Sequence, residues 1–455
     1  MRGFRVIYAL VGAALAFSGP SAMADESAYR EAKTRALEWL ASQMVPNETV
    51  PDPQPGRAHL ILSYRVPESD PARAFLAGRS MTYDNALAAI AFTLARDYEN
   101  ASYILNALSR LTPKDGVLWF GYNTHNDWPS RDDSSGALAR AGASAWAGYA
   151  AVFYLLQRRA EDPAFLENDR EARTYLRMAR SIATRLQALM VTDEDDLRYG
   201  LVTGGKNSYG LRYSSNAVNE AFLEGEIGWA SSEHNIDAYF FFHDLGILTN
   251  DESYLAAAEL IKKGLFRLWS SKEAQFFQGV KPKRIDKVLA LDCASWGSMF
   301  ALSVNKPAWA SETIKGIDKK YRSFDAMPGK EGSRVEGYKP YEDAPVFEDA
   351  SDAVYDFYFK KKGRVTWKEL NGVWGEGSLG VALAFLKQGN DAKAREILDE
   401  VITLQDPSGG VLYFTRAVPH VFVDYPSVAS TAWLAIVLSA VEDPRASAGF
   451  MGSAR

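Results

Sequence analysis

Carboxylate side chains recur at the start of long apolar segments of this sequence, often beside an aromatic residue. Glu233 and Asp237 lie four residues apart, one helical turn, at the head of an apolar run. Glu376 follows Trp374 by two positions, and Asp84 opens a further apolar segment. Two carboxyl groups can divide the work of breaking a glycosidic bond, because one protonates the leaving oxygen while the other activates water or attacks carbon. Aromatic faces nearby can hold the sugar rings.

Glu376, Glu233 and Asp84 are the predicted catalytic residues, and their surroundings separate their roles. Apolar and aromatic neighbours such as Trp374 raise the pKa of a carboxyl group, which suits Glu376 to the part of general acid. A helix N-terminus favours a charged carboxylate, so we expect Glu233 or Asp84 to be the base that activates water. The glycines on both sides of Glu376 would let a ligand approach it closely.

Other polar and aromatic residues near these positions are predicted to bind the sugar. Each class also has a structural interpretation, since a carboxylate can cap a helix, a histidine or tryptophan can belong to the core, and Asp237 can pair with a buried arginine or tyrosine. Trp128 lies in an oxygen-rich segment, 124–133, which we expect at the rim of the site. The predicted substrate-binding residues are His234, Asn235, Asp237, Asp292, Trp128, Trp296, Trp374 and Tyr425.

Several classes of function are disfavoured by composition and by missing motifs. The net charge is −6 and no lysine- and arginine-rich block is present, which argues against nucleic acid or an anionic membrane as the partner. The sequence contains no P-loop, dinucleotide fingerprint, HExxH or GxSxG motif, and segment 124–133 lacks the ligand spacing of an EF-hand. We therefore expect neither a metal nor a cofactor. The single cysteine, Cys293, allows no intramolecular disulfide.

The segments that must position these residues alternate between two types. Six nearly all-apolar helices are predicted to start near residues 82, 141, 233, 291, 374 and 426, each paired with an amphipathic helix. Helices that are apolar all round belong inside a protein, and helices with one apolar stripe belong outside. Six inner and six outer helices in alternation predict a closed all-α toroid with parallel inner helices. An open α-solenoid is the alternative, although its repeats should be more regular.

Parallel inner helices would bring all their N-termini to one mouth of the toroid. The segments that enter them, such as 112–140, 193–232 and 323–372, are long, whereas the connections at the other end are short. Functional residues are therefore expected on the long-loop face.

The motifs TYDNALAA, SSEHNIDAY, WGEGSLGVALA and YPSVASTAW at the predicted inner-helix starts add a resemblance. With the alternating pattern, they resemble the (α/α)6-toroid, or six-hairpin, glycosidases of bacteria. The resemblance implies the toroid over the whole mature chain and a polysaccharide or oligosaccharide substrate. The same scaffold also serves polysaccharide lyases, phosphorylases and non-hydrolytic relatives, so it implies the fold more firmly than the reaction.

The beginning of the chain has the pattern of a cleavable signal peptide. Arg2 and Arg5 precede a short apolar run, and Ala22-Met23-Ala24 has the small-x-small form of a cleavage site. We therefore expect a signal peptide over residues 1–24, a single domain over 25–455, no stable membrane insertion, and export to the periplasm or the medium.

Together these features predict an exported glycoside hydrolase that uses carboxylate acid–base catalysis. One alternative is a polysaccharide lyase on the same scaffold, with Tyr239, His234 and Arg131 as candidates for abstracting the proton beside a uronic acid carboxylate. The mostly acidic helix starts disfavour a lyase, whose cleft should be basic. The other alternative is a non-catalytic glycan-binding protein of an envelope polysaccharide system.

Overall fold

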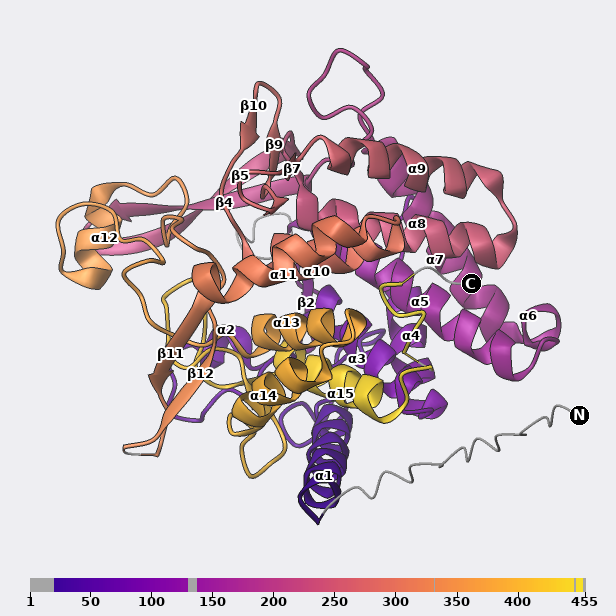
Figure 1. The fold of residues 1–455 in the computed structure, drawn as a ribbon, viewed down its shortest axis with the longest axis horizontal. Helices are drawn as coiled ribbons and strands as arrows, with labels where there is room; N and C mark the ends of the chain where they lie inside the picture. Colours follow the sequence, from indigo (N-terminus) through magenta and orange to yellow (C-terminus); the bar gives the residue numbers. More distant parts are fainter. Residues whose placement is uncertain (1–19, 130–136, 331, 446, 453–455) are drawn as a thin grey trace, which may run out of the picture.

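The computed structural model describes residues 20–129, 137–330, 332–445 and 447–452, and it is rich in helix, with several small sheets (Figure 1). Helices buried all round alternate with helices buried on one face. The first type comprises α3 (Thr82–Leu94), α5 (Ala141–Glu161), α8 (Ser232–Thr249), α10 (Leu291–Ser303), α13 (Gly375–Lys387) and α15 (Val428–Glu442). The second comprises α1 (Pro20–Ser42), α4 (Tyr98–Leu111), α7 (Arg170–Ala188), α9 (Glu252–Phe266), α11 (Pro307–Tyr321) and α14 (Asp391–Ile402).

Burial of these helices follows the hydrophobic pattern of the sequence. In α15 every residue from Val428 to Ala440 is buried, because almost all of them are apolar or small. In α7 the buried residues recur at helical spacing, among them Tyr175, Met178 and Ile182, and the charged face is left to solvent. The helices of the first type start at residues 82, 141, 232, 291, 375 and 428, within two residues of the predicted positions, so the predicted alternation is confirmed.

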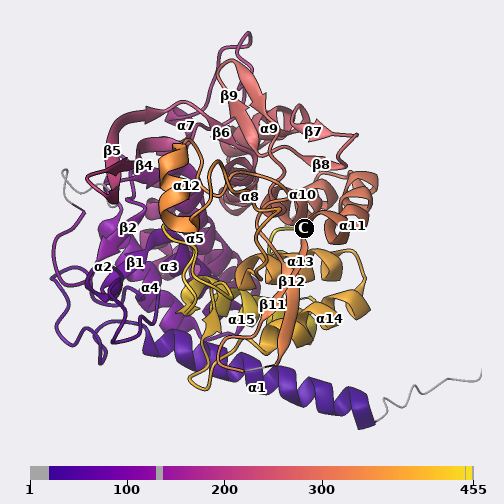
Figure 2. The ribbon, with the colours of Figure 1, turned by 90° about the vertical axis from the view of Figure 1, so that its left-hand side faces the viewer.

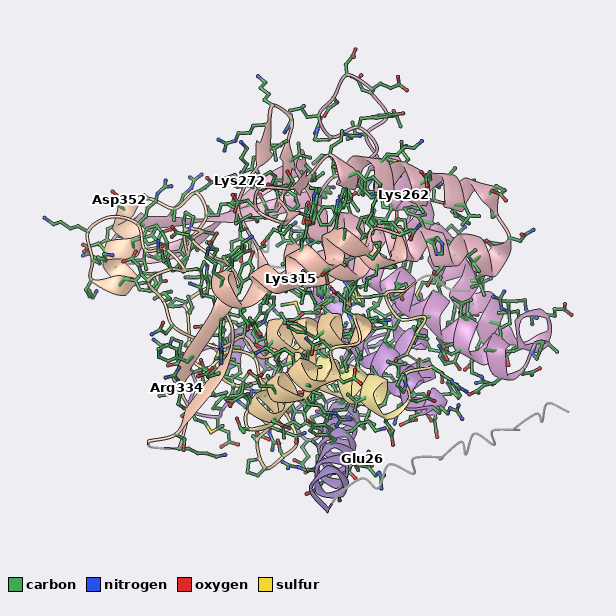
Figure 3. All side chains as sticks on the ribbon, viewed as in Figure 1. Glu26, Lys262, Lys272, Lys315, Arg334 and Asp352 are labelled. Atoms are coloured by element: carbon green, nitrogen blue, oxygen red, sulfur yellow. The ribbon has the colours of Figure 1, made fainter. Side chains whose placement is uncertain are left out.

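Contacts between helices form a closed cycle. Helix α3 packs on α5, α5 on α8, α8 on α10, α10 on α13, α13 on α15, and α15 returns to α3. Each helix of this cycle also packs mainly on one amphipathic helix, and α1 covers α15 although the two are far apart in the sequence. Figure 2 shows the cycle around the middle of the molecule and α1, α7, α9, α11 and α14 toward its outside. Charged side chains such as Glu26, Lys262 and Lys315 lie at this periphery (Figure 3).

The expectation of an all-α protein needs correction, because the long entry segments form short sheets. Their backbone N–H and C=O groups need partners, and antiparallel pairing supplies them. Strand β1 pairs with β2, β7 with β8, β11 with β12 and β13 with β14, while β3-β4-β5 and β10-β9-β6 are three-stranded. The strands are β1 (Arg79–Met81), β2 (Gly121–Asn123), β3 (Ala139–Arg140), β4 (Gly205–Ser214), β5 (Ala217–Ile227), β6 (Ala230–Ser231), β7 (Trp269–Ser270), β8 (Gln275–Phe276), β9 (Gly279–Lys281), β10 (Arg284–Asp286), β11 (Arg322–Ala326), β12 (Arg334–Tyr338), β13 (Val411–Leu412) and β14 (Pro426–Ser427).

Several of these strands hold the starts of the buried helices. Strands β1, β3, β6 and β14 run directly into α3, α5, α8 and α15, so pairing of each strand fixes the first turn of the helix that follows. Three short helices complete the fold: α2 (Arg73–Leu76), α6 (Phe165–Asn168) and α12 (Asp352–Phe359). Helix α12 packs against the long hairpin β4–β5 (Figure 1).

The predicted signal peptide falls mostly outside the described residues, which begin at residue 20. Helix α1 starts there, five residues before the expected mature N-terminus at Asp25. Within the described part of the chain, no helix has the length and apolar character that crossing a membrane requires.

Candidate active site

A cavity of about 1400 Å³ opens at the N-terminal ends of the six buried helices. The first turn of every one of these helices lines this cavity. The residues that they contribute include Tyr83 and Asp84 from α3, Gly142 and Trp146 from α5, Glu233, His234 and Asp237 from α8, Asp292 and Trp296 from α10, Glu376 from α13 and Ala429 from α15.

Glu376 is buried in the wall of the cavity and is held by a tyrosine from another helix. The hydroxyl of Tyr83 donates a hydrogen bond to Oε1 of Glu376 at 2.5 Å, and it accepts one from Nε1 of Trp433 at 3.0 Å. Burial raises the pKa of Glu376 to about 8, the Tyr83 hydrogen bond opposes that rise, and the charges of Asp84 and Glu233 add to it. Glu376 is therefore mostly protonated at neutral pH.

Close packing of the chain explains the two glycines beside Glu376, which the sequence analysis attributed to close approach of a ligand. A Cβ on Gly377 would lie 2.2 Å from the Trp374 ring, and a Cβ on Gly375 would lie 2.5 Å from the backbone carbonyl oxygen of Leu412. Both glycines are thus required by close packing of the chain itself.

Glu233 and Asp84 reach the same cavity from α8 and α3. Glu233 is half-buried, and desolvation raises its pKa to about 7. Asp84 is buried, and desolvation raises its pKa to about 7 against the opposing effect of a hydrogen bond with Ser63. Glu233 does not cap its helix, because the Ser231 hydroxyl accepts the hydrogen bond from the backbone N–H of His234.

Asp237 and Asp292 add two further acidic groups. Burial, together with the charge of Glu233, raises the pKa of Asp237 well above its ordinary value, and the Trp146 indole offsets part of the rise. Burial and the charges of Glu233, Glu376 and Asp237 raise the pKa of Asp292 in the same direction. Within the described residues, neither Asp237 oxygen accepts a well-formed hydrogen bond, so the alternative in which Asp237 pairs with a buried arginine or tyrosine is not seen. The raised pKa favours the neutral form of both groups.

Aromatic side chains make up the floor of the cavity. The Trp146 ring meets Tyr83, Trp296 and Trp433 edge-on, with centroids 5.5, 5.8 and 6.2 Å apart, and Trp296 stacks on Trp433 at 5.8 Å. The indole nitrogens of Trp146, Trp296 and Trp374 are buried and make no well-formed hydrogen bond among the described residues, although Trp146 interacts with Asp237 and Trp374 with Glu376. A buried donor without a partner is costly, so a ligand rich in hydroxyl groups would be favoured here.

The rim carries the other predicted aromatic residues. Trp128 lies beneath the guanidinium of Arg79, 4.6 Å from its ring centroid, and the rest of the expected rim loop, 130–133, falls outside the described residues. Tyr425 is buried against the cavity, and its hydroxyl has no partner in the described part of the chain. His420 joins two segments of the mouth, because hydrogen bonds link it to Glu220 of β5 at 3.0 Å and to Tyr358 of α12 at 2.7 Å.

Asn235 is the predicted substrate-binding residue that the structure places elsewhere. Its amide oxygen accepts the backbone N–H of Val202 at 2.7 Å, and its nitrogen donates to the carbonyl oxygens of Val202 and Ser231 at 3.0 and 2.8 Å. It is fully buried and does not line the cavity, so its part is to fasten a loop to α8. Its neighbour His234 does line the cavity, with Nδ1 unpartnered among the described residues and a pKa lowered to about 4 by burial and by Arg140.

Some cavity residues were missed by sequence reasoning. Tyr83 had a usable signal, since it lies in the same first helical turn as Asp84. Tyr64 and Tyr413 also line the cavity, but they lie in connecting segments whose spacing predicts nothing. The lyase candidate Tyr239 packs in the core against Phe300 and does not line the cavity, and Arg131 lies outside the described residues.

Metal binding finds no support in the described part of the chain, where no group of three or more histidine, cysteine, aspartate and glutamate side chains could hold an ion.

Comparison with known proteins gives the fold a context. No family model matches the sequence, and no curated protein matches it significantly. A glycosidase solved in complex with glucose matches the structure with a TM-score of 0.56 at 11% identity, over 92% of this chain and 98% of that one. The fold is glycosidase-like. A D-mannose isomerase matches with a TM-score of 0.53 at 10% identity, over 93% and 99% of the two chains. An α-amylase from Clostridium perfringens matches with a TM-score of 0.50 at 11% identity, over 90% of this chain and 97% of that one.

Proposed function

We propose that this chain is an (α/α)6-toroid glycoside hydrolase that cleaves a polysaccharide or oligosaccharide by carboxylate acid–base catalysis. The observation that carries the proposal is the single cavity in which helix starts from distant parts of the chain place Glu376, Glu233 and Asp84 among tryptophans. The closed cycle of helix contacts supports the toroid, and the glycosidase-like fold is consistent with this chemistry.

Glu376 would act as the general acid. Its raised pKa of about 8 keeps a proton available at neutral pH, and the Tyr83 hydrogen bond orients the carboxyl group. In the reaction, that proton moves to the leaving glycosidic oxygen as its bond to the anomeric carbon breaks. Glu233, which faces the cavity and has a pKa of about 7, would remove a proton from the water that adds to the same carbon. Asp84 is the alternative base.

The other lining residues would hold the sugar. Indole N–H groups on the floor can donate to sugar hydroxyl groups, and ring faces can stack on the apolar face of a sugar. His234 is neutral and can exchange hydrogen bonds with hydroxyl groups. Asp237 and Asp292, whose pKa values burial raises, can accept hydrogen bonds and in their neutral form also donate one. The proposed substrate-binding residues are His234, Asp237, Asp292, Trp128, Trp296, Trp374 and Tyr425.

We also propose that the protein is exported. The basic start, short apolar run and Ala22-Met23-Ala24 support a signal peptide over residues 1–24, with one domain from Asp25 onward in the periplasm or the medium.

The experiment that tests this function is a substrate screen of the chain from Asp25 onward. New reducing ends and the ultraviolet absorbance of unsaturated uronides would be read together, with free aldoses and ketoses included. Reducing ends without absorbance, abolished in Glu376→Gln and Glu233→Gln but not in the exposed control Glu312→Gln, are expected. Absorbance would show a lyase, aldose–ketose conversion would show an isomerase, and binding without turnover would show a glycan-binding scaffold.

A further inference from the structure

One cationic side chain in the cavity wall has no acidic partner among the residues that the structure describes. Arg140 lies at the start of α5 and lines the cavity. Its Nη1 donates to the backbone carbonyl oxygens of Asn207 at 2.7 Å and of Ala139 and Lys206 at 3.3 Å each. Among the residues that the structure describes, no carboxylate forms an ion pair with Arg140, and its Nε and Nη2 have no hydrogen-bond partner.

The partly desolvated guanidinium of Arg140 raises the free energy of the folded protein unless an anion binds beside it. Burial lowers the pKa of Arg140 to about 10, so the side chain is still charged at neutral pH but is poorly solvated. Its charge is felt by its neighbours, because it helps to lower the pKa of His234. Arg140 is half-buried. An ion that is partly withdrawn from water is normally compensated by a partner of opposite sign, and here the cavity is where that partner can bind.

The surroundings of Arg140 strengthen the local positive potential. Helix α5 has 21 residues, Arg140 is its N-cap residue, and no side chain caps it. Gly142 and Ala143 of its first turn also line the cavity, so their end of the helix dipole faces the ligand space. His234 lies directly against this turn, since a Cβ on Gly142 would be 2.4 Å from the imidazole.

Two acidic groups of the cavity oppose this potential less than an ordinary carboxylate would. Burial raises the pKa of Asp237 and of Asp292 well above the ordinary value, which favours the neutral form of each. A negatively charged sugar therefore meets less repulsion than the number of carboxyl groups implies.

We infer that Arg140 binds a carboxylate of the substrate, which makes the preferred substrate an oligosaccharide that contains a hexuronic acid. This inference rests on the proposed function. The free Nε and Nη2 form one edge of the guanidinium, and that edge matches the two oxygens of a carboxylate in a bidentate pair. A sulfate ester presents related chemistry and is the alternative source of the anion.

Binding without turnover tests the inference apart from the reaction. Isothermal titration of the Glu376→Gln protein would compare a hexuronic acid oligosaccharide, its methyl ester and a sulfated neutral oligosaccharide. We expect the acid to bind about 10- to 100-fold more tightly than the ester, in line with a charge-assisted bidentate pair. Adding Arg140→Gln should abolish that preference. Arg140→Lys should keep part of it, because lysine retains the positive charge but cannot donate two parallel hydrogen bonds to a carboxylate as a guanidinium does.

The control variant is Arg177→Gln, which changes an exposed arginine of α7 and should leave the preference intact. Thermal melting of each variant shows whether it is folded. If Arg140→Gln does not fold, Arg140→Lys still tests the inference. Equal binding of acid and ester, binding of the sulfated sugar alone, or an acid preference that survives Arg140→Gln would overturn the inference. Hydrolysis of neutral glycans with no acid preference would overturn it and leave the proposed function standing.

Discussion

Replacing Glu376 with glutamine should make the stability of the protein less sensitive to alkaline pH. The pKa of Glu376 is raised from 4.5 in a solvated chain to about 8 in the folded protein. Because the folded pKa is the higher one, the stabilisation is fully present below pH 4.5 and is lost as the pH rises through about 8. One pKa unit corresponds to about 1.4 kcal/mol, so the carboxyl group should cost about 3 kcal/mol of stability between about pH 5.5 and pH 8.

Thermal melting of the parent and of Glu376→Gln at these two pH values is the assay. The variant should gain melting temperature relative to the parent at the higher pH, by several degrees more than at the lower pH. Glu312→Gln, an exposed change on α11, serves as the control and should show no such difference. A gap between parent and Glu376→Gln that is the same at both pH values would refute the raised pKa and, with it, the reason for naming Glu376 as the acid.

Three other substitutions give distinct outcomes. Tyr83→Phe removes the hydrogen bond that lowers the pKa of Glu376, so the alkaline limb of the kcat/KM profile should move up by about 1–2 pH units; a limb that stays in place would count against Glu376 as the acid. Asn235→Ala should lower the free energy of unfolding by about 3 kcal/mol in urea titration, with activity per folded molecule retained; loss of activity alone would restore its predicted binding role. Gly142→Ala should displace His234 and lower kcat/KM by about 10-fold or more, and unchanged kinetics would exclude His234 from the site.

The buried helices could be predicted from the sequence because their signal is local and strong. In α15 and α13, apolar and small residues cover every face, and only the interior of a protein accommodates such helices. Because an outer helix follows each inner helix and returns the chain, the alternation predicts that the N-termini of the inner helices lie at the same end of the molecule. That is why Glu376, Glu233 and Asp84, at positions far apart in the chain, could be assigned to one cavity.

The finer features of the site depend on contacts that no local pattern encodes. The Tyr83–Glu376 hydrogen bond joins residues 293 positions apart. The two-residue strand β3 exists because Ala139 and Arg140 pair with β4, and a segment that short carries no periodicity. Asn235 has the residue type of a sugar ligand, and only its backbone partners reveal a structural part.

The most direct test of Glu376 as the general acid is to ask whether the activity lost in Glu376→Gln depends on the leaving group of the substrate. The measurement compares Glu376→Gln with the parent on two glycosides of the same sugar, one with a dinitrophenolate leaving group and one with an alcohol. Acid catalysis contributes about 10²- to 10⁴-fold where the leaving oxygen needs a proton and little where it does not. We predict a loss of that size on the alcohol glycoside and nearly full activity on the dinitrophenyl glycoside. An equal loss on both would contradict the assignment of Glu376 as the acid.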